Sequence, residues 1–438
     1  MGMALSGLCC AADCAVCLAC KSICACCPSS SKSAPSPDAG RWGSLWVMIF
    51  AIVGSLFLQY YAALHFNYSI LDEGCDDTAC RGAALVYRVS CCTALLFLVN
   101  GVVAYVHPPA HDRFWFAKVL AWLAILGISL AVPSAVFDLR GFAWLARIGA
   151  FAFVVVQQVL LIDLAYHVND TLVTLADSGE VSLWCGVPSP LVALITAACG
   201  LFSVAVAGTA LLFVYFNMNC AGPFIILVVT CFGVVIATLC QLFASKDSNL
   251  LTSSVVASYA TYLAAAALAA NPVDKCNAVS ATGKDWLSIA LGIGFTAIAL
   301  LYTCYSASSQ VAYLKDGRGA ASAAPGGAMM TRVLAAAMPE GERVYGAEAA
   351  NEAGAQPDDA PQKTRFDVVA FNAVMALMAM MVSMVLTNWG SIPKARGAQT
   401  PQAGNVAMWM QAAAQWTALL LYVWTSVAPA LCPDRDFS

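Results

Sequence analysis

Residues 142–166 read FAWLARIGAFAFVVVQQVLLIDLAY, a run in which only Arg147 and Asp163 carry charge. A helix of about 20 apolar residues crosses the hydrocarbon core of a bilayer, so this stretch predicts a transmembrane helix. Apolar residues make up 61% and charged residues 11% of the 438-residue chain, whereas about 25% of the residues in soluble domains are charged. So few charges could not cover a soluble protein of this size, and the chain is predicted to be an all-α polytopic membrane protein.

Further apolar runs bring the predicted number of transmembrane helices to about ten. The predicted spans cover residues 44–66, 84–106, 114–136, 142–166, 189–216, 221–243, 250–270, 285–306, 366–388 and 405–431. An even number places both termini on one side of the membrane. The 21 Lys and Arg residues divide thirteen to eight in favour of cytosolic termini, although loop 167–188 carries none of them. We expect no cleavable signal peptide, because no basic start precedes the first apolar stretch.

The span pattern divides the chain into four segments. Residues 1–40 form a Cys-rich, membrane-associated start, and residues 41–306 hold the first eight predicted helices. Residues 307–365 are rich in Ala, Gly and charge but poor in large apolar side chains, which predicts a disordered cytosolic loop. Residues 366–438 contain the last two helices and a C-terminal tail.

The cysteine-rich start allows two interpretations. CxxC spacing recurs between Cys14 and Cys20 and would suit zinc, but no separated second pair and no nearby His completes a site. The interleaved apolar residues favour a helix along the membrane surface, with its thiols packed or acylated, and the first six residues fit a myristoylation pattern. The acylation candidates are Gly2, Cys9, Cys10 and Cys14. We therefore predict no bound metal and no cofactor.

Two further cysteines, Cys75 and Cys80, lie in the first predicted outer loop among four acidic residues. On the oxidising side of a membrane these thiols could pair. The acidic residues would also suit calcium, but the spacing of a helix–loop–helix calcium site is absent. Most other cysteines lie in apolar runs, where a thiol acts as a small apolar group.

Charged residues inside predicted spans are functional candidates, because a charge in lipid is costly. Asp163 lies near the cytosolic end of the fourth span and Lys118 near the cytosolic start of the third. Consecutive antiparallel spans place the two charges at similar depth, so an ion pair is predicted. In the alternative, Lys118 extends to the headgroups while Asp163 meets backbone or water. Arg88 and Arg147, near the outer ends of their spans, are predicted to extend to the headgroups too.

Sequence motifs of common enzymes are absent. The chain contains no GxSxG, no phosphate-binding Gly loop and no HExxH, and its four His residues form no metal-binding spacing. No basic patch is dense enough to suggest nucleic acid. We predict that the protein is not an enzyme and binds no nucleic acid.

Several stretches together resemble the serine incorporator family. They include FWFAK at 114–118, QVLLIDLA at 158–165 followed by Asn169, and LLYVWT at 420–425 before the final RDFS at 435–438. Their order and spacing match the family along most of the chain. One departure is Tyr166, which stands where the family has His, with His167 one place later.

The resemblance implies a fold and a location. It implies ten helices in two subdomains, divided by a long oblique helix, in the plasma membrane or in endomembranes such as the Golgi or the ER. It also implies a link to phosphatidylserine and sphingolipid synthesis, with lipid scrambling in some members.

Non-enzymatic lipid transport or scrambling is the first functional hypothesis, with membrane lipids such as phosphatidylserine and sphingolipid precursors as partners. In this hypothesis, lipid headgroups move along a row of polar side chains, which we call the polar lane. The residues predicted to line it are Lys118, Gln157, Gln158, Asp163, Tyr166, His167 and Asn169. One alternative is a scaffold that gathers serine or lipid-synthesis enzymes on the cytosolic loop. Another is a small-solute carrier, which the lack of paired broken helices disfavours. The sequence is also compatible with a homo-oligomer.

Overall fold

The computed structural model describes residues 39–62, 78–107, 110–133, 136–137, 141–177, 183–184, 187–216, 220–243, 249–277, 290, 293–294, 296–298, 365–387, 389, 393–394, 398–399 and 401–431. Within these residues, eight helices are long and apolar enough to cross a membrane. The predicted all-α polytopic class is confirmed. The segment 1–38 and the loop from 301 to 364 lie outside the described residues, as does most of the predicted span 285–306.

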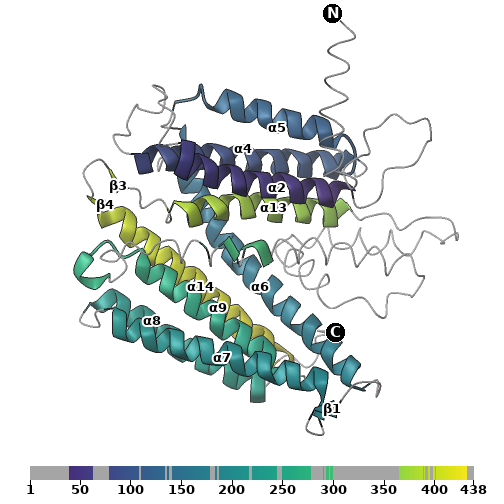
Figure 1. The fold of residues 1–438 in the computed structure, drawn as a ribbon, viewed down its shortest axis with the longest axis vertical. Coiled ribbons are helices and arrows are strands. Elements are labelled where there is room, and N and C mark those ends of the chain that lie inside the picture. The colour runs from purple at the N-terminus through teal and green to yellow at the C-terminus, as the bar shows by residue number, and fades with distance from the viewer. Residues whose placement is uncertain are drawn as a thin grey trace, which may run out of the picture.

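The first helix group contains α2 (Ala39–Phe57), α4 (Thr78–Val106), α5 (Trp115–Ser129) and α13 (Arg365–Leu386). Figure 1 shows these helices lying side by side, with α4 packed along α13 and α2. A π-helical turn, η1 (Leu58–Ala62), follows α2. The third predicted span, 114–136, is a helix of only 15 residues, because the chain turns over Leu130–Val132 before Pro133, and the residue before a proline avoids the helical conformation.

The second helix group contains α7 (Ser189–Tyr215), α8 (Ala221–Phe243), α9 (Leu250–Ala269) and α14 (Pro401–Leu431). These four helices form the other half of the molecule in Figure 1. The start of α9 is capped by Asn249, whose side-chain oxygen accepts hydrogen bonds from the Leu251 and Thr252 N–H groups at 3.0 and 3.3 Å. Most of α7 is exposed, as expected of a helix that faces lipid.

Helix α6 (Phe142–Asp177) joins the two groups and runs obliquely between them (Figure 1). It packs on α13 in the first group and on α9, α14 and α7 in the second. Its 36 residues span about 54 Å at 1.5 Å per residue, more than the roughly 30 Å of a hydrocarbon core. The predicted end at residue 166 was therefore too early. Residues 167–177 contain neither Gly nor Pro to stop the helix.

Short elements connect the helices. Strand β1 (Leu183–Trp184) pairs antiparallel with β2 (Val187–Pro188), with Leu183 opposite Pro188. In the same way, β3 (Pro393–Lys394) pairs with β4 (Ala398–Gln399) before α14. A 3-10 turn, η4 (Asp274–Cys276), follows α9. None of these elements extends the helical core, which sits between α4, α6, α9 and α13.

Candidate functional site

Polar side chains gather on α6 where it passes from the first helix group into the second. Gln157, Gln158 and Asp163 are each at most 4% exposed, and Tyr166 and His167 are half-buried. Among the residues that the structure describes, Asp163 is the one acidic side chain that is buried. Because unpaired polar groups are costly inside a membrane, this polar stretch of α6 is the first candidate for a functional site.

Five side chains from four helices form what we call the inner polar cluster, which consists of Tyr166, Gln241, Ser253, Tyr422 and Ser426. Gln241 Nε2 donates to Tyr166 Oη at 3.0 Å, and Ser426 Oγ donates to Gln241 Oε1 at 2.9 Å. The hydroxyls of Ser253 and Tyr422 lie 3.2 Å apart. The cluster holds α6, α8, α9 and α14 together at the end of the second group that the sequence predicts to be cytosolic.

Asp163 lies at the edge of this cluster. It precedes Tyr166 by one helical turn, and its neighbour Ile162 packs in an apolar cluster with Val256, Leu419 and Tyr422. The structure thus assigns this part of α6 to the second helix group. Beyond it, His167 and Asn169 are half-buried on the polar end of the helix.

Closer to the middle of α6, two buried glutamines carry incompletely used amides. Tyr259 Oη donates to Gln157 Oε1 at 3.1 Å. The Nε2 groups of Gln157 and Gln158 have no hydrogen-bond partner within the described chain. Buried polar groups in proteins are nearly always hydrogen-bonded, so two unpaired amide donors on one helix call for partners beyond the described residues.

Lys118 does not join this site. Its Nζ donates to the carbonyls of Ala110 and His111 at 2.8 and 2.9 Å and lies 4.5 Å from the centre of the Trp115 ring. Helix α5 packs on α4 and α2, whereas Asp163 lies in the second group. The predicted Lys118–Asp163 ion pair is therefore wrong, because α6 leaves the first group before it reaches Asp163.

Two arginines that were expected to reach the headgroups are instead buried. Arg88 is 0% exposed; its Nη1 donates to the carbonyls of Ser129 and Val132, at the end of α5, and its guanidinium lies over Phe137. Arg147 is 5% exposed and donates to the Trp389 carbonyl from Nε and Nη2 at 3.1 and 2.9 Å. Both arginines thus donate to backbone carbonyls at or just beyond the end of a helix, α5 for Arg88 and α13 for Arg147.

The first helix group has a polar cluster of its own. Asn100 Nδ2 donates to Asn372 Oδ1 at 2.9 Å, and both Nδ2 atoms lie within 3.3 Å of His111 Nδ1. Asp112 Oδ1 accepts the Gly40 N–H at 2.9 Å. Within the described ranges, no three His, Cys, Asp or Glu side chains group closely enough to hold a metal ion.

The described cysteines include one disulfide that the sequence did not indicate, between Cys220 and Cys276. Cys80 is also disulfide-bonded. Cys75 lies outside the described residues, so the pairing of these two stays a prediction. The acylation candidates Gly2, Cys9, Cys10 and Cys14 also lie outside them.

Sequence reasoning missed most partners of α6. Gln241, Ser253, Tyr422 and Ser426 are neutral and lie within apolar spans, where nothing in the pattern separates a functional hydroxyl from one that bonds its own helix. Their shared location at the predicted cytosolic ends of three helices was the signal available. Only the packing of α8, α9 and α14 around α6 brings them together.

Comparison with known proteins places the chain in a family. The sequence profile of the family described as serine incorporator (Serinc) matches residues 9–435. A probable serine incorporator from Nematostella vectensis is 26% identical over 99% of this chain and 100% of its own length. Serine incorporator 5 from Rattus norvegicus is 26% identical over 82% and 79%, and membrane protein TMS1 from Saccharomyces cerevisiae is 24% identical over 90% and 89%. The chain thus belongs to the serine incorporator family.

Proposed function

We propose that the protein moves lipids between the two leaflets without catalysing a reaction, and that headgroups pass along the polar side chains of α6 and of the helices packed around it. The observation that carries this proposal is the pair of buried amides on Gln157 and Gln158, whose Nε2 donors have no partner in the described chain. The phosphate and carboxylate oxygens of a headgroup are acceptors that would satisfy such donors. A lipid that slides along α6 would keep its tails in the bilayer.

The inner polar cluster and Asp163 extend this lane toward the face that we propose is cytosolic. Tyr166 and Gln241 lie close to that end, and the half-buried His167 and Asn169 follow. Lys118 is removed from the proposed lane because its amino group is bound within the first helix group. The remaining candidates are Gln157, Gln158, Asp163, Tyr166, His167 and Asn169.

The lipid class and the location are part of the same proposal. Relatives carry the name serine incorporator, which favours phosphatidylserine and sphingolipid precursors as the lipids that this chain handles. We propose residence in the plasma membrane or in endomembranes of the Golgi or ER, with both termini cytosolic. The Cys220–Cys276 disulfide supports this orientation, because the charge pattern puts both cysteines on the non-cytosolic side, where disulfides form.

Reconstitution tests the proposal. Purified protein in liposomes with fluorescent phosphatidylserine or phosphatidylcholine should expose inner-leaflet lipid to an impermeant quencher. The Gln158→Leu variant should scramble about tenfold more slowly, because one hydrogen bond to a charged headgroup is worth about 1.5 kcal/mol or more and 1.4 kcal/mol corresponds to tenfold in rate.

A stability measurement separates function from folding. Since Gln158→Leu removes an unpaired buried amide, its melting temperature in detergent should equal or exceed that of the wild type. Thr196→Val, on the exposed face of α7, is the control and should scramble normally. Wild-type scrambling no faster than protein-free liposomes would refute the proposed function.

A further inference from the structure

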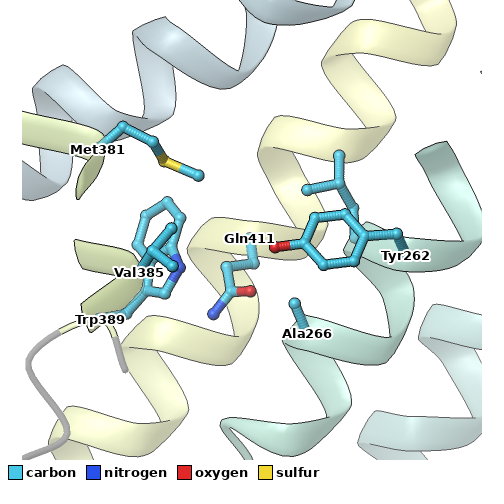
Figure 2. Close-up of a pocket in the computed structure, with 7 residues that line it drawn as sticks. Tyr262, Ala266, Met381, Val385, Trp389 and Gln411 are labelled. Carbon is cyan, nitrogen blue, oxygen red and sulfur yellow. The ribbon is translucent and has the colours of Figure 1, made fainter. Parts of the chain in front are cut away.

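A crevice separates the two helix groups on the side of the membrane opposite the inner polar cluster. It leaves about 20 Å³ of room for a group the size of a water molecule, and its walls include Tyr262 and Ala266 from α9, Met381 and Val385 from α13, Trp389, and Gln411 from α14. Figure 2 shows the Trp389 and Tyr262 rings on opposite sides, with the Gln411 amide between them. The crevice lies near the last turns of α9 and α13 and the first part of α14.

Gln411 is the feature that calls for a ligand. Its side chain is 2% exposed, and neither Nε2 nor Oε1 has a hydrogen-bond partner within the described chain. Figure 2 shows the amide at the centre of the crevice, not directed into a helix. A buried amide with both its donor and its acceptor unused is costly, and a group that enters the crevice could use both.

The residues that line the crevice limit which chemical groups could bind next to Gln411. No charged side chain lines the crevice, whose other surfaces are aromatic rings, a thioether and aliphatic groups. An ionised phosphate carries a negative charge and has only acceptor oxygens, so it would leave Oε1 unpaired, and no cation in the crevice would offset its charge. A hydroxyl both donates and accepts, so it can satisfy Nε2 and Oε1 of one amide together.

The Trp389 wall is held in place by α6. Trp389 has a φ of 56°, in the left-handed region that side chains rarely adopt, and its carbonyl accepts two hydrogen bonds from Arg147. Strained backbone persists where surrounding contacts fix it, and such positions cluster at ligand sites. Arg147 is thus a positioning residue for one side of the crevice.

We propose that this crevice binds the hydroxyl-bearing end of an uncharged membrane lipid, with Gln411 as the hydrogen-bonding group and Trp389 and Tyr262 as the walls. The space of about 20 Å³ admits a group the size of one water molecule, so it takes the hydroxyl itself while the rest of the lipid stays in the bilayer. Sterols and ceramides both carry such a hydroxyl. This site goes beyond the proposed function, because it selects a neutral lipid and lies away from the lane on the cytosolic half of α6.

Photo-crosslinking tests the proposal with three probes. Purified full-length protein in mixed micelles is exposed to diazirine analogues of cholesterol, of ceramide or of phosphatidylcholine, each with and without excess unlabelled lipid. We expect competable labelling of the peptides that contain Tyr262–Ala266 or Met381–Trp389 by at least one hydroxyl probe. The probe that labels identifies the source, and labelling by both means that the hydroxyl alone is recognised. Equal labelling by phosphatidylcholine would overturn the proposal.

Two variants test the residues. Gln411→Leu should weaken binding of the labelling probe about tenfold, the loss expected for two neutral hydrogen bonds, and Ala266→Phe should abolish it by filling the space. Trp409→Leu removes an exposed aromatic from the same helix and should bind normally. Thermal melting checks that each variant is folded. Unchanged labelling in both folded crevice variants, or no labelling of these peptides by either hydroxyl probe, would contradict the proposal.

Discussion

Lys118 and Asp163 show that the surroundings of a charge inside an apolar run depend on packing as well as on depth. The amino group of Lys118 binds two carbonyls of the loop just before α5 and lies over Trp115. Asp163 is buried in the second helix group, next to the inner polar cluster. The two residues therefore act on different parts of the molecule, although they lie at similar predicted depth.

A double-mutant cycle should show that the two charges act independently. Lys118→Met removes two charge-assisted hydrogen bonds and should cost about 2 kcal/mol of stability, and its effect should add to that of Asp163→Asn within about 0.5 kcal/mol. Thermal or denaturant unfolding in detergent gives both values. The pair Gln241→Leu and Ser426→Ala, whose side chains are hydrogen-bonded, is the positive control and should couple. A coupling above about 1 kcal/mol between residues 118 and 163 would mean that they touch.

The sequence could predict which polar residues interrupt the apolar helices but not which partners they meet. Gln157, Gln158 and Asp163 stand out because they interrupt an apolar run. Arg88 and Arg147 stand out for the same reason, yet their partners are backbone carbonyls of Ser129, Val132 and Trp389. Every residue has a carbonyl, so no side-chain pattern marks those that will accept a hydrogen bond from an arginine.

At the scale of helices, length was easier to predict than contact. Apolar runs predict the bounds of α7 and α8 closely, because the hydrocarbon core sets the length of a span. Helix α6 extends further because polar residues can continue a helix in water. Close approach between helices follows instead from single small residues, as Gly43 on α2 illustrates. A Cβ at Gly43 would lie 2.1 Å from the Trp115 ring of α5.

A pair of glycines on α2 tests that contact. Gly43→Ala should destabilise the protein by about 1–3 kcal/mol, because the buried Trp115 ring would have to move. Gly54→Ala, where a Cβ would meet nothing within 4 Å, should be neutral or stabilising by up to about 1 kcal/mol, since Ala favours helix. Melting temperatures of the two purified variants provide the comparison. Equal effects would mean that α2 and α5 are not packed through Gly43.

At the scale of the whole molecule, α6 gives the two helix groups a shared surface. It packs on α13 in one group and on α9 and α14 in the other, so a shift of one group against the other would alter both the α6 lane and the crevice at Gln411. The family resemblance implied the two subdomains and the oblique helix, whereas composition predicted only a helical membrane protein. The polar lane and the crevice required the packing of segments more than a hundred residues apart, such as Gln157 with Tyr259.

The orientation of the whole molecule in the membrane can be tested through its disulfides and its long loop. The charge pattern puts Cys220, Cys276 and Cys80 on the non-cytosolic side, and all three are disulfide-bonded, as oxidising compartments favour. Both termini and loop 307–365 should then be cytosolic.

If the protein reaches the surface of intact cells, an impermeant reductant followed by an impermeant maleimide should label Cys220 and Cys276. Added protease should leave loop 307–365 uncut until the cells are permeabilised. A Cys220→Ser, Cys276→Ser double variant controls for labelling elsewhere. Cleavage of the loop in intact cells, with both cysteines unlabelled, would reverse the orientation and place the inner polar cluster on the outer face.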